Sequence, residues 1–79
     1  MTKLIIHDVR LTDVKGLEKL TNLKWLQLYR NQLTDVKGLE KLTQLELMDL
    51  SNNPDLTKAQ ITELQKALPK CKISHDAKR

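Results

Sequence analysis

The apolar residues of the middle of the chain follow a spacing that changes from three to two. Between Val14 and Leu23 they stand at every third position, and between Leu26 and Leu28 the spacing is two. A spacing of three keeps side chains aligned on a 3₁₀ path, whereas an α-helix would spread them around its surface. A spacing of two is that of a strand. The pattern therefore predicts a 3₁₀-like return segment followed by one short strand.

This pattern occurs twice. The segment LTDVKGLEKLT stands at 11–21 and, unchanged, at 33–43, so the period is twenty-two positions. A fixed period of about 20 to 50 residues indicates a solenoid, in which each coil stacks on the next. The strands are followed by Asn31 and Asn53, whose amides can satisfy backbone groups that a turn leaves unpaired. We expect these two amides to line up in a row and to be structural.

The repeat resembles the leucine-rich repeat family, specifically the 22-residue class found in bacterial internalin-like proteins. The family motif LxxLxLxxNxL is matched by Leu23, Leu26, Leu28, Asn31 and Leu33. The second copy departs from it, because one extra residue precedes Leu56. The resemblance implies an α/β solenoid: a short right-handed coil with four parallel strands on its concave face, 3₁₀-like returns and a C-terminal α-helix. It also implies binding without catalysis.

We interpret the chain as a single domain. It comprises a partial first repeat (1–10), full repeats (11–32 and 33–54), a C-terminal capping repeat (55–76) and a tail (77–79). In the capping repeat, Thr57 with Gln60 fits a capping box that would start a helix, and Pro69 would end it. Counting one period from the second copy, plus its one extra residue, places Cys71 at the position of Met48, inside the core of a final strand.

The N-terminal end of this solenoid is expected to be uncovered. Counting back one period from the strand at Leu26 to Leu28 places the first strand at Leu4 to Ile6, with no polar cap before it. The exposed flank would include Leu4, Ile6, Leu11 and Leu17. Either the chain is a piece of a longer solenoid or another chain covers this edge. The perfect duplication fits recent gene duplication and consensus-style design equally well.

Side chains alternate along a strand, so the residues beside the inward leucines point outward. The expected outward columns are Lys3, Trp25, Leu47, Lys70; Ile5, Gln27, Asp49, Lys72; and His7, Tyr29, Ser51, Ser74. The only Trp and the only Tyr of a chain without Phe both fall on this concave face. The return segments of the two copies are identical, whereas every outward strand position differs. Such a surface is typical of a binding site.

The predicted function is therefore a non-catalytic protein–protein interaction module that binds through this face. The predicted partner-binding residues are Ile5, His7, Trp25, Gln27, Tyr29, Leu47, Asp49 and Lys72, with Asp49 and Lys72 side by side. The partner is another protein or a second copy of the chain. The alternative is a structural, self-assembling unit, truncated or engineered, that associates through its uncapped N-terminal edge.

Charge and composition argue against other classes. The net charge is +4, but Lys15 and Lys19 stand beside Asp13 and Glu18, which is unlike a stripe that follows phosphates, so no nucleic acid is expected. The single cysteine allows no internal disulfide and fits a reducing compartment. The N-terminal apolar run, residues 4–6, is too short for a signal peptide or a membrane span, so we expect no membrane partner and a cytoplasmic location.

Catalytic chemistry is also not expected. His7 and His75 stand on the first and last strands, and Cys71 is expected to point inward, so no nucleophilic or metal-binding constellation forms. Gly16 and Gly38 are isolated repeat positions rather than a phosphate-binding loop. The sequence thus predicts neither an enzyme nor a cofactor or metal site.

Overall fold

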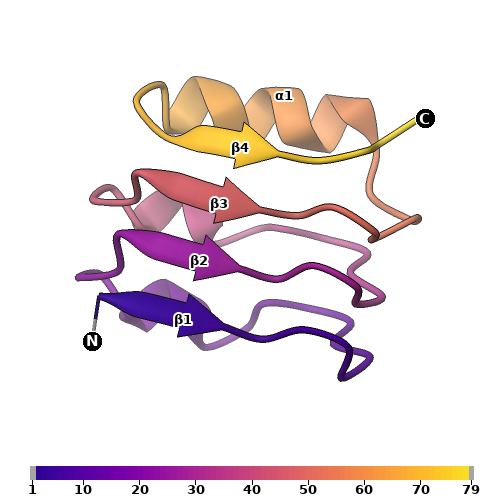
Figure 1. The fold of residues 1–79 in the computed structure, drawn as a ribbon. Helices are drawn as coiled ribbons and strands as arrows, with labels where there is room; N and C mark the ends of the chain where they lie inside the picture. The colour runs from indigo at the N-terminus through magenta and orange to yellow at the C-terminus, as the bar shows by residue number, and fades with distance from the viewer. Residues whose placement is uncertain (1, 79) are drawn as a thin grey trace.

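The structure is a computed structural model that describes residues 2–78. The elements are β1 (Lys3–Ile5), η1 (Leu17–Lys19), β2 (Trp25–Gln27), η2 (Leu39–Lys41), β3 (Leu47–Asp49), α1 (Lys58–Ala67) and β4 (Lys72–Ser74). The strands form one all-parallel sheet in the order β1-β2-β3-β4, and the 3₁₀ turns and α1 lie behind it (Figure 1). Four parallel strands, short 3₁₀ turns and a C-terminal helix were all predicted, and they are confirmed.

The repeat in the sequence is matched by a repeat in the structure. Leu4 pairs with Leu26 and Leu26 pairs with Met48, each one period further along the chain. The side chains of Leu26 and Met48 are fully buried, whereas the neighbouring Trp25 is exposed. Because successive side chains of a strand point to opposite faces, one face of the sheet packs on the core and the other faces solvent.

Asn31 and Asn53 are buried and hold successive repeats together. The Nδ2 atom of Asn31 donates to the carbonyl of Ile6 at 2.9 Å, one repeat earlier, and its Oδ1 accepts from the backbone N–H groups of Val9 and Leu11. Asn53 repeats the arrangement one unit later, accepting from the N–H of Leu33. Their predicted structural role, with the amides in a row, is confirmed.

One of the positions at which the backbone enters the left-handed region recurs in three successive repeats. Asp8, Arg30 and Asn52, each one period apart, have φ angles of 58°, 59° and 59°. Each directly precedes the residue at the turn-asparagine position, which is Asn31 after Arg30 and Asn53 after Asn52. Residues other than glycine meet a steric penalty in this region. Asp8 and Asn52 are of the residue types that tolerate this region best after glycine, whereas at Arg30 the turn geometry takes precedence over local preference.

Helix α1 begins and ends as predicted. The Thr57 hydroxyl accepts from the N–H of Gln60 at 3.2 Å, and Gln60 Oε1 accepts from the N–H of Thr57 at 2.9 Å, which completes the capping box. Ile61 and Leu64 are buried against the core, and Leu68 is the C-cap residue before Pro69. The helix covers the core behind the last strands (Figure 1).

The predicted register of the last strand is wrong by two residues. Met48 pairs with Ile73 rather than with Cys71, so β4 lies two positions further along the chain than counting from β3 predicts. An α-helix rises about 1.5 Å per residue and a 3₁₀ turn about 2.0 Å, so a return through α1 needs more residues to cover the same length. Cys71 is nevertheless buried, as expected.

Candidate binding face

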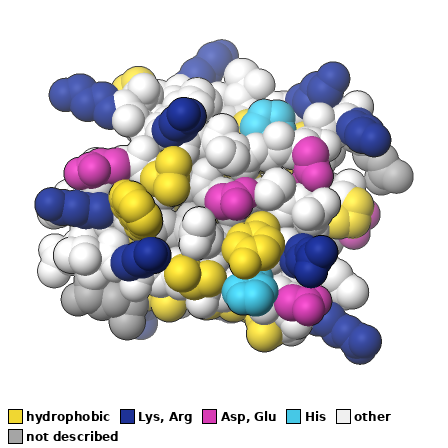
Figure 2. Space-filling view, viewed as in Figure 1, with side chains coloured by type: hydrophobic (Ala, Val, Ile, Leu, Met, Phe, Trp, Pro, Cys, Tyr) yellow, Lys and Arg dark blue, Asp and Glu magenta, His cyan; other side chains and the backbone are white. Residues whose placement is uncertain are grey.

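The solvent-facing side of the sheet is called here the open sheet face. Its members are Lys3, Ile5, Trp25, Gln27, Leu47, Asp49, Lys72 and Ser74, with His7, Tyr29 and Ser51 just beyond the strands. All eight residues predicted from the sequence to bind a partner belong to it. Figure 2 looks onto this face and shows hydrophobic side chains gathered over β1 to β3, with basic and acidic side chains around them. The prediction that these residues share one surface is consistent with the register.

Trp25 is the largest exposed side chain of this cluster. It is 43% exposed, and Ile5 on the adjacent strand is 45% exposed. The Nζ atom of Lys3 lies 4.8 Å from the centroid of the Trp25 ring, within the range of a cation–π contact. Lys3 was not among the predicted binding residues. The expected outward columns nevertheless placed it beside Trp25, one period earlier, and the sheet register confirms that place.

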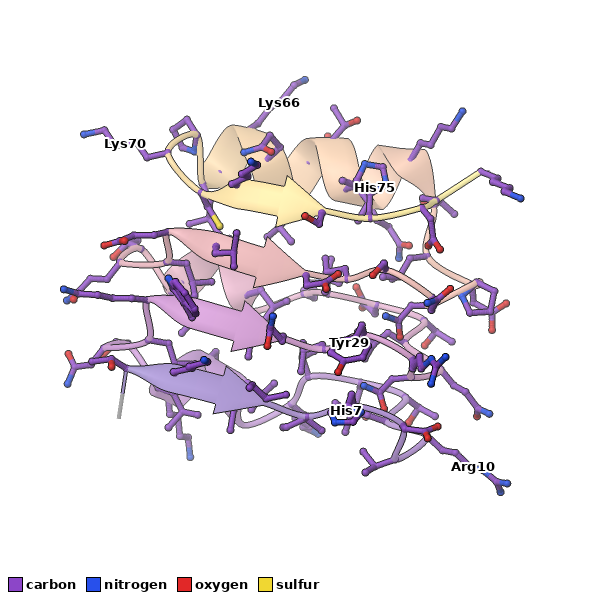
Figure 3. The ribbon with its side chains drawn as sticks, in the orientation of Figure 1. His7, Arg10, Tyr29, Lys66, Lys70 and His75 are labelled. Carbon is purple, nitrogen blue, oxygen red and sulfur yellow. The ribbon has the colours of Figure 1, made fainter. Side chains whose placement is uncertain are left out.

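His7 and Tyr29 stack on each other where β1 and β2 end. Their ring centroids are 4.7 Å apart and the ring planes differ by 5° (Figure 3). The backbones continue side by side past the strands, since the N–H of Ile6 donates to the carbonyl of Gln27 and that of Asp8 to the carbonyl of Arg30. Tyr29 is partly exposed and His7 is exposed, so the stacked pair remains accessible on this face.

Asp49 does not lie beside Lys72, contrary to the sequence prediction. Asp49 pairs with Ser74, and Lys72 pairs with Leu47, because of the two-residue shift of β4. The Asp49 carboxylate instead accepts from Ser51, from the hydroxyl at 2.6 Å and from the N–H at 3.0 Å. A shift of two residues preserves the alternation of side chains, so Lys72 remains on the open sheet face, at its β4 edge.

The open sheet face is mainly apolar at its centre and basic at two edges. Ile5, Trp25, Tyr29 and Leu47 lie on β1 to β3 or directly after β2. Lys3 lies at one side, on β1, and Lys72 at the other, on β4. Asp49, the one carboxylate among the described members of the face, is already engaged by Ser51. Such a surface suits an apolar partner side chain placed between acidic ones.

The cysteine and the best-formed groove of the molecule are not part of the open sheet face. Burial raises the pKa of the Cys71 thiol, so this residue is a weak nucleophile. A shallow groove of about 340 Å³ lies between η2 and α1, away from the open sheet face.

Within residues 2–78, no group of three or more His, Cys, Asp or Glu side chains is arranged to hold a metal ion. Nor does the described part of the chain contain a helix long and apolar enough to cross a membrane.

Comparison with known proteins assigns no relative. No protein-family model matches the chain, and no curated protein matches it at a significant level.

Proposed function

We propose that the chain is a leucine-rich repeat solenoid that acts as a non-catalytic protein-binding module. In this proposal the open sheet face is the concave surface of the solenoid, and the partner contacts it around Trp25 and Tyr29. The observation that carries the proposal is the placement of the aromatic residues. The buried core is almost entirely aliphatic, while the only Trp and the only Tyr lie on the open sheet face.

The energetics of the core support this assignment. Removing a buried aromatic side chain costs several kcal/mol, so aromatic residues that serve stability are expected inside. Trp25 contributes little to the core, because nearly half of its surface is exposed and Lys3 covers one of its faces. Trp and Tyr are the residues most enriched among those that dominate binding free energy at protein interfaces. An exposed cluster of this kind is therefore better explained by contact with a partner than by folding.

The repeat adds a second line of support. The return segments at 11–21 and 33–43 are identical, and they form the same 3₁₀ turns with Gly16 and Gly38 at φ angles of 95° and 106°. The outward strand residues differ completely: Trp25, Gln27 and Tyr29 in one copy, and Leu47, Asp49 and Ser51 in the next. A scaffold that is held constant under a surface that varies is the arrangement that repeat proteins use for recognition.

The size of the face limits the partner. Neighbouring strands lie about 4.8 Å apart, so four strands give a sheet about 15 Å wide. The whole molecule measures 29 × 26 × 17 Å. A surface of a few hundred Å² is smaller than the roughly 800 Å² per partner of a standard interface. We therefore propose a short peptide segment as the ligand, with an apolar or aromatic anchor for Trp25 and a carboxylate for Lys3 or Lys72.

Selection of a peptide tests the proposal. A library of random twelve-residue peptides is selected on the immobilised protein, and the enriched peptide is titrated while the fluorescence of Trp25, the only tryptophan, is recorded. The expected result is saturable binding that weakens at least tenfold in the Trp25→Phe/Tyr29→Ala variant, which is titrated by calorimetry because it has no tryptophan. Lys37→Ala, an exposed residue outside the face, is the matched control and retains binding.

Two results would contradict the proposal. Equal binding of the selected peptide to the wild type and to Trp25→Phe/Tyr29→Ala, measured by calorimetry, would move the site elsewhere. A large loss of thermal stability in Trp25→Ala and Tyr29→Ala would mean that these side chains serve the fold. Circular dichroism of each variant accompanies every titration, so that a loss of binding is read only from folded protein.

A further inference from the structure

Four outward side chains form one row across the open sheet face. The paired residues of successive strands are, in order, Lys3, Trp25, Leu47 and Lys72. Both lysines and Trp25 are exposed, and Leu47 is half-buried. This row, called here the Lys3–Lys72 row, therefore carries a cation at each end and an apolar pair between them.

The adjacent row, two residues further along the strands, has a different charge. Its members are Ile5, Gln27, Asp49 and Ser74. The carboxylate of Asp49 lies on β3, between the two ends of the sheet, where it accepts from the Ser51 hydroxyl at 2.6 Å. A fixed carboxylate at this place repels an acidic ligand group near the centre of the face. Acidic groups are therefore favoured only at the two ends of the Lys3–Lys72 row.

The length of the row matches a short extended peptide. Neighbouring strands lie about 4.8 Å apart, so three intervals separate the Cα atoms of Lys3 and Lys72 by about 14 Å. An extended chain rises about 3.3 Å per residue and points alternate side chains to the same side, so positions i, i+2 and i+4 cover about 13 Å. The middle side chain of such a ligand lies between Trp25 and Leu47. A helical ligand rises about 1.5 Å per residue, so its positions i, i+4 and i+7 cover only about 10 Å.

We propose that the preferred ligand of the open sheet face is an extended peptide in which an apolar residue has Asp or Glu two positions away on either side. The peptide crosses the strands along the Lys3–Lys72 row. Its apolar side chain packs between Trp25 and Leu47, and each carboxylate pairs with one of the terminal lysines. This inference rests on the proposed function and adds to it the spacing of the acidic residues, which both lysines read at once.

Lys3 is already positioned for this role in the free protein. Its Nζ atom lies 4.8 Å from the centroid of the Trp25 ring. An ammonium group has three N–H donors, so Lys3 can bind a carboxylate while it stays beside the ring. A side chain that is held in place before binding loses less conformational entropy when the ligand arrives. Trp25 therefore serves both as an apolar contact and as a support for the lysine.

Three seven-residue peptides test the spacing. The first has phenylalanine at its centre, glutamate two positions away on either side, and serine elsewhere. The second has the glutamates directly beside the phenylalanine, where an extended chain points them to the opposite side. In the third, glutamine replaces both glutamates of the first. Each peptide is titrated against the protein while the fluorescence of Trp25, the only tryptophan, is recorded.

The first peptide is expected to bind saturably and about tenfold more tightly than the third, since two exposed ion pairs each contribute about threefold. The second peptide should bind at least roughly threefold more weakly than the first, because it cannot reach both lysines with its phenylalanine on the sheet. Raising the salt concentration should weaken the binding of the first peptide and leave that of the third unchanged.

Variants of the two lysines locate the contacts. Lys3→Gln and Lys72→Gln should each weaken binding of the first peptide about threefold, and the double variant about tenfold, because sites this far apart act independently. Lys37→Gln, an exposed residue outside the open sheet face, is the matched control and should bind like the wild type. Circular dichroism checks that each variant is folded. If the double variant does not fold, the three peptides titrated against the wild type carry the test.

Three results would overturn the proposal: no saturable binding of the first peptide, equal affinity for all three peptides, or full affinity of the first peptide for a folded double variant. The library selection described above separates this failure from failure of the proposed function. A selected peptide that binds through Trp25 and Tyr29 without the acidic spacing would overturn only the spacing. Failure of both the designed and the selected peptides would overturn the proposed function as well.

Discussion

Asn31 and Asn53 donate to the same acceptor: the Nδ2 atom of each lies 3.0 Å from the carbonyl oxygen of Leu28. A carbonyl oxygen has two lone pairs, and both are used here by buried amides. Asn53 also donates to the carbonyl of Leu50 in its own repeat, so it bonds to two adjacent repeats at once. The pair therefore ties the repeats together at the turns that follow the strands.

Replacing Asn53 with alanine should be strongly destabilising. The change removes three donor contacts, and it leaves the N–H of Leu33 and the carbonyl of Leu50 without this partner inside the protein. Each buried polar group that loses its partner costs roughly 1 to 3 kcal/mol, so we expect the free energy of unfolding to fall by about 3 kcal/mol, measured by urea denaturation. Gln44→Ala, at an exposed position, is the control. A loss no larger than that of Gln44→Ala would show that water replaces the amide.

Much of the fold could be predicted because its signals are local. The spacing of leucines, the turn asparagines and the Thr57–Gln60 capping box each act over a few residues. The register of β4 could not be predicted in this way. It depends on how many residues α1 needs to cross behind the sheet, and this length is set by the rise of the helix and by its packing on the core. Counting from the previous repeat therefore gave the wrong partner for Met48.

The open sheet face could be predicted from alternation alone, whereas its contacts could not. Alternation decides to which side a residue points, and it gave the correct side even for Lys72, whose register was wrong. Lys3 contacts Trp25, and Asp49 accepts a hydrogen bond from Ser51, although each side chain has several neighbours within reach. Which neighbour a side chain contacts depends on its rotamer and on which donor is nearest. A pattern of apolar and polar positions does not contain that information.

The capping box of α1 offers a second prediction. Thr57→Ala removes the hydroxyl that accepts from the N–H of Gln60, at the start of the helix that covers the core. Loss of such a cap typically costs about 1 kcal/mol. We expect the free energy of unfolding, measured by urea denaturation, to fall by about that amount. Thr62→Ala, within the same helix and exposed, is the control and should leave stability unchanged or raise it slightly.

Substitution of Arg30 tests whether its left-handed conformation carries a cost. Its φ of 59° is tolerated best by Gly and Asn and worst by β-branched residues. Arg30→Asn should therefore be neutral or slightly stabilising, and Arg30→Val should lower the free energy of unfolding by roughly 1 kcal/mol relative to Arg30→Asn. Thermal melting of the two variants measures this difference. Lys24→Val, at an exposed position outside the left-handed region, shows the effect of valine alone.

The buried thiol of Cys71 makes stability depend on pH in the alkaline range. Burial raises its pKa, so the folded protein keeps the thiol proton at a pH where the unfolded chain has begun to lose it. This contribution is fully present below the pKa of the unfolded thiol and is lost as the pH rises through that of the folded one. Between about pH 8 and pH 10, the free energy of unfolding should fall more steeply for the wild type than for Cys71→Val, which has no thiol to titrate.

Reaction of the thiol with Ellman's reagent provides the independent measurement. Because the thiolate is the reactive species and Cys71 is buried, we expect labelling of the folded protein to be at least roughly tenfold slower than labelling in denaturing urea. Labelling of the folded protein at the denatured rate would place Cys71 at the surface. Parallel stability curves of the wild type and Cys71→Val across the alkaline range would contradict the raised pKa, since a thiol with equal proton affinity in both states adds no slope.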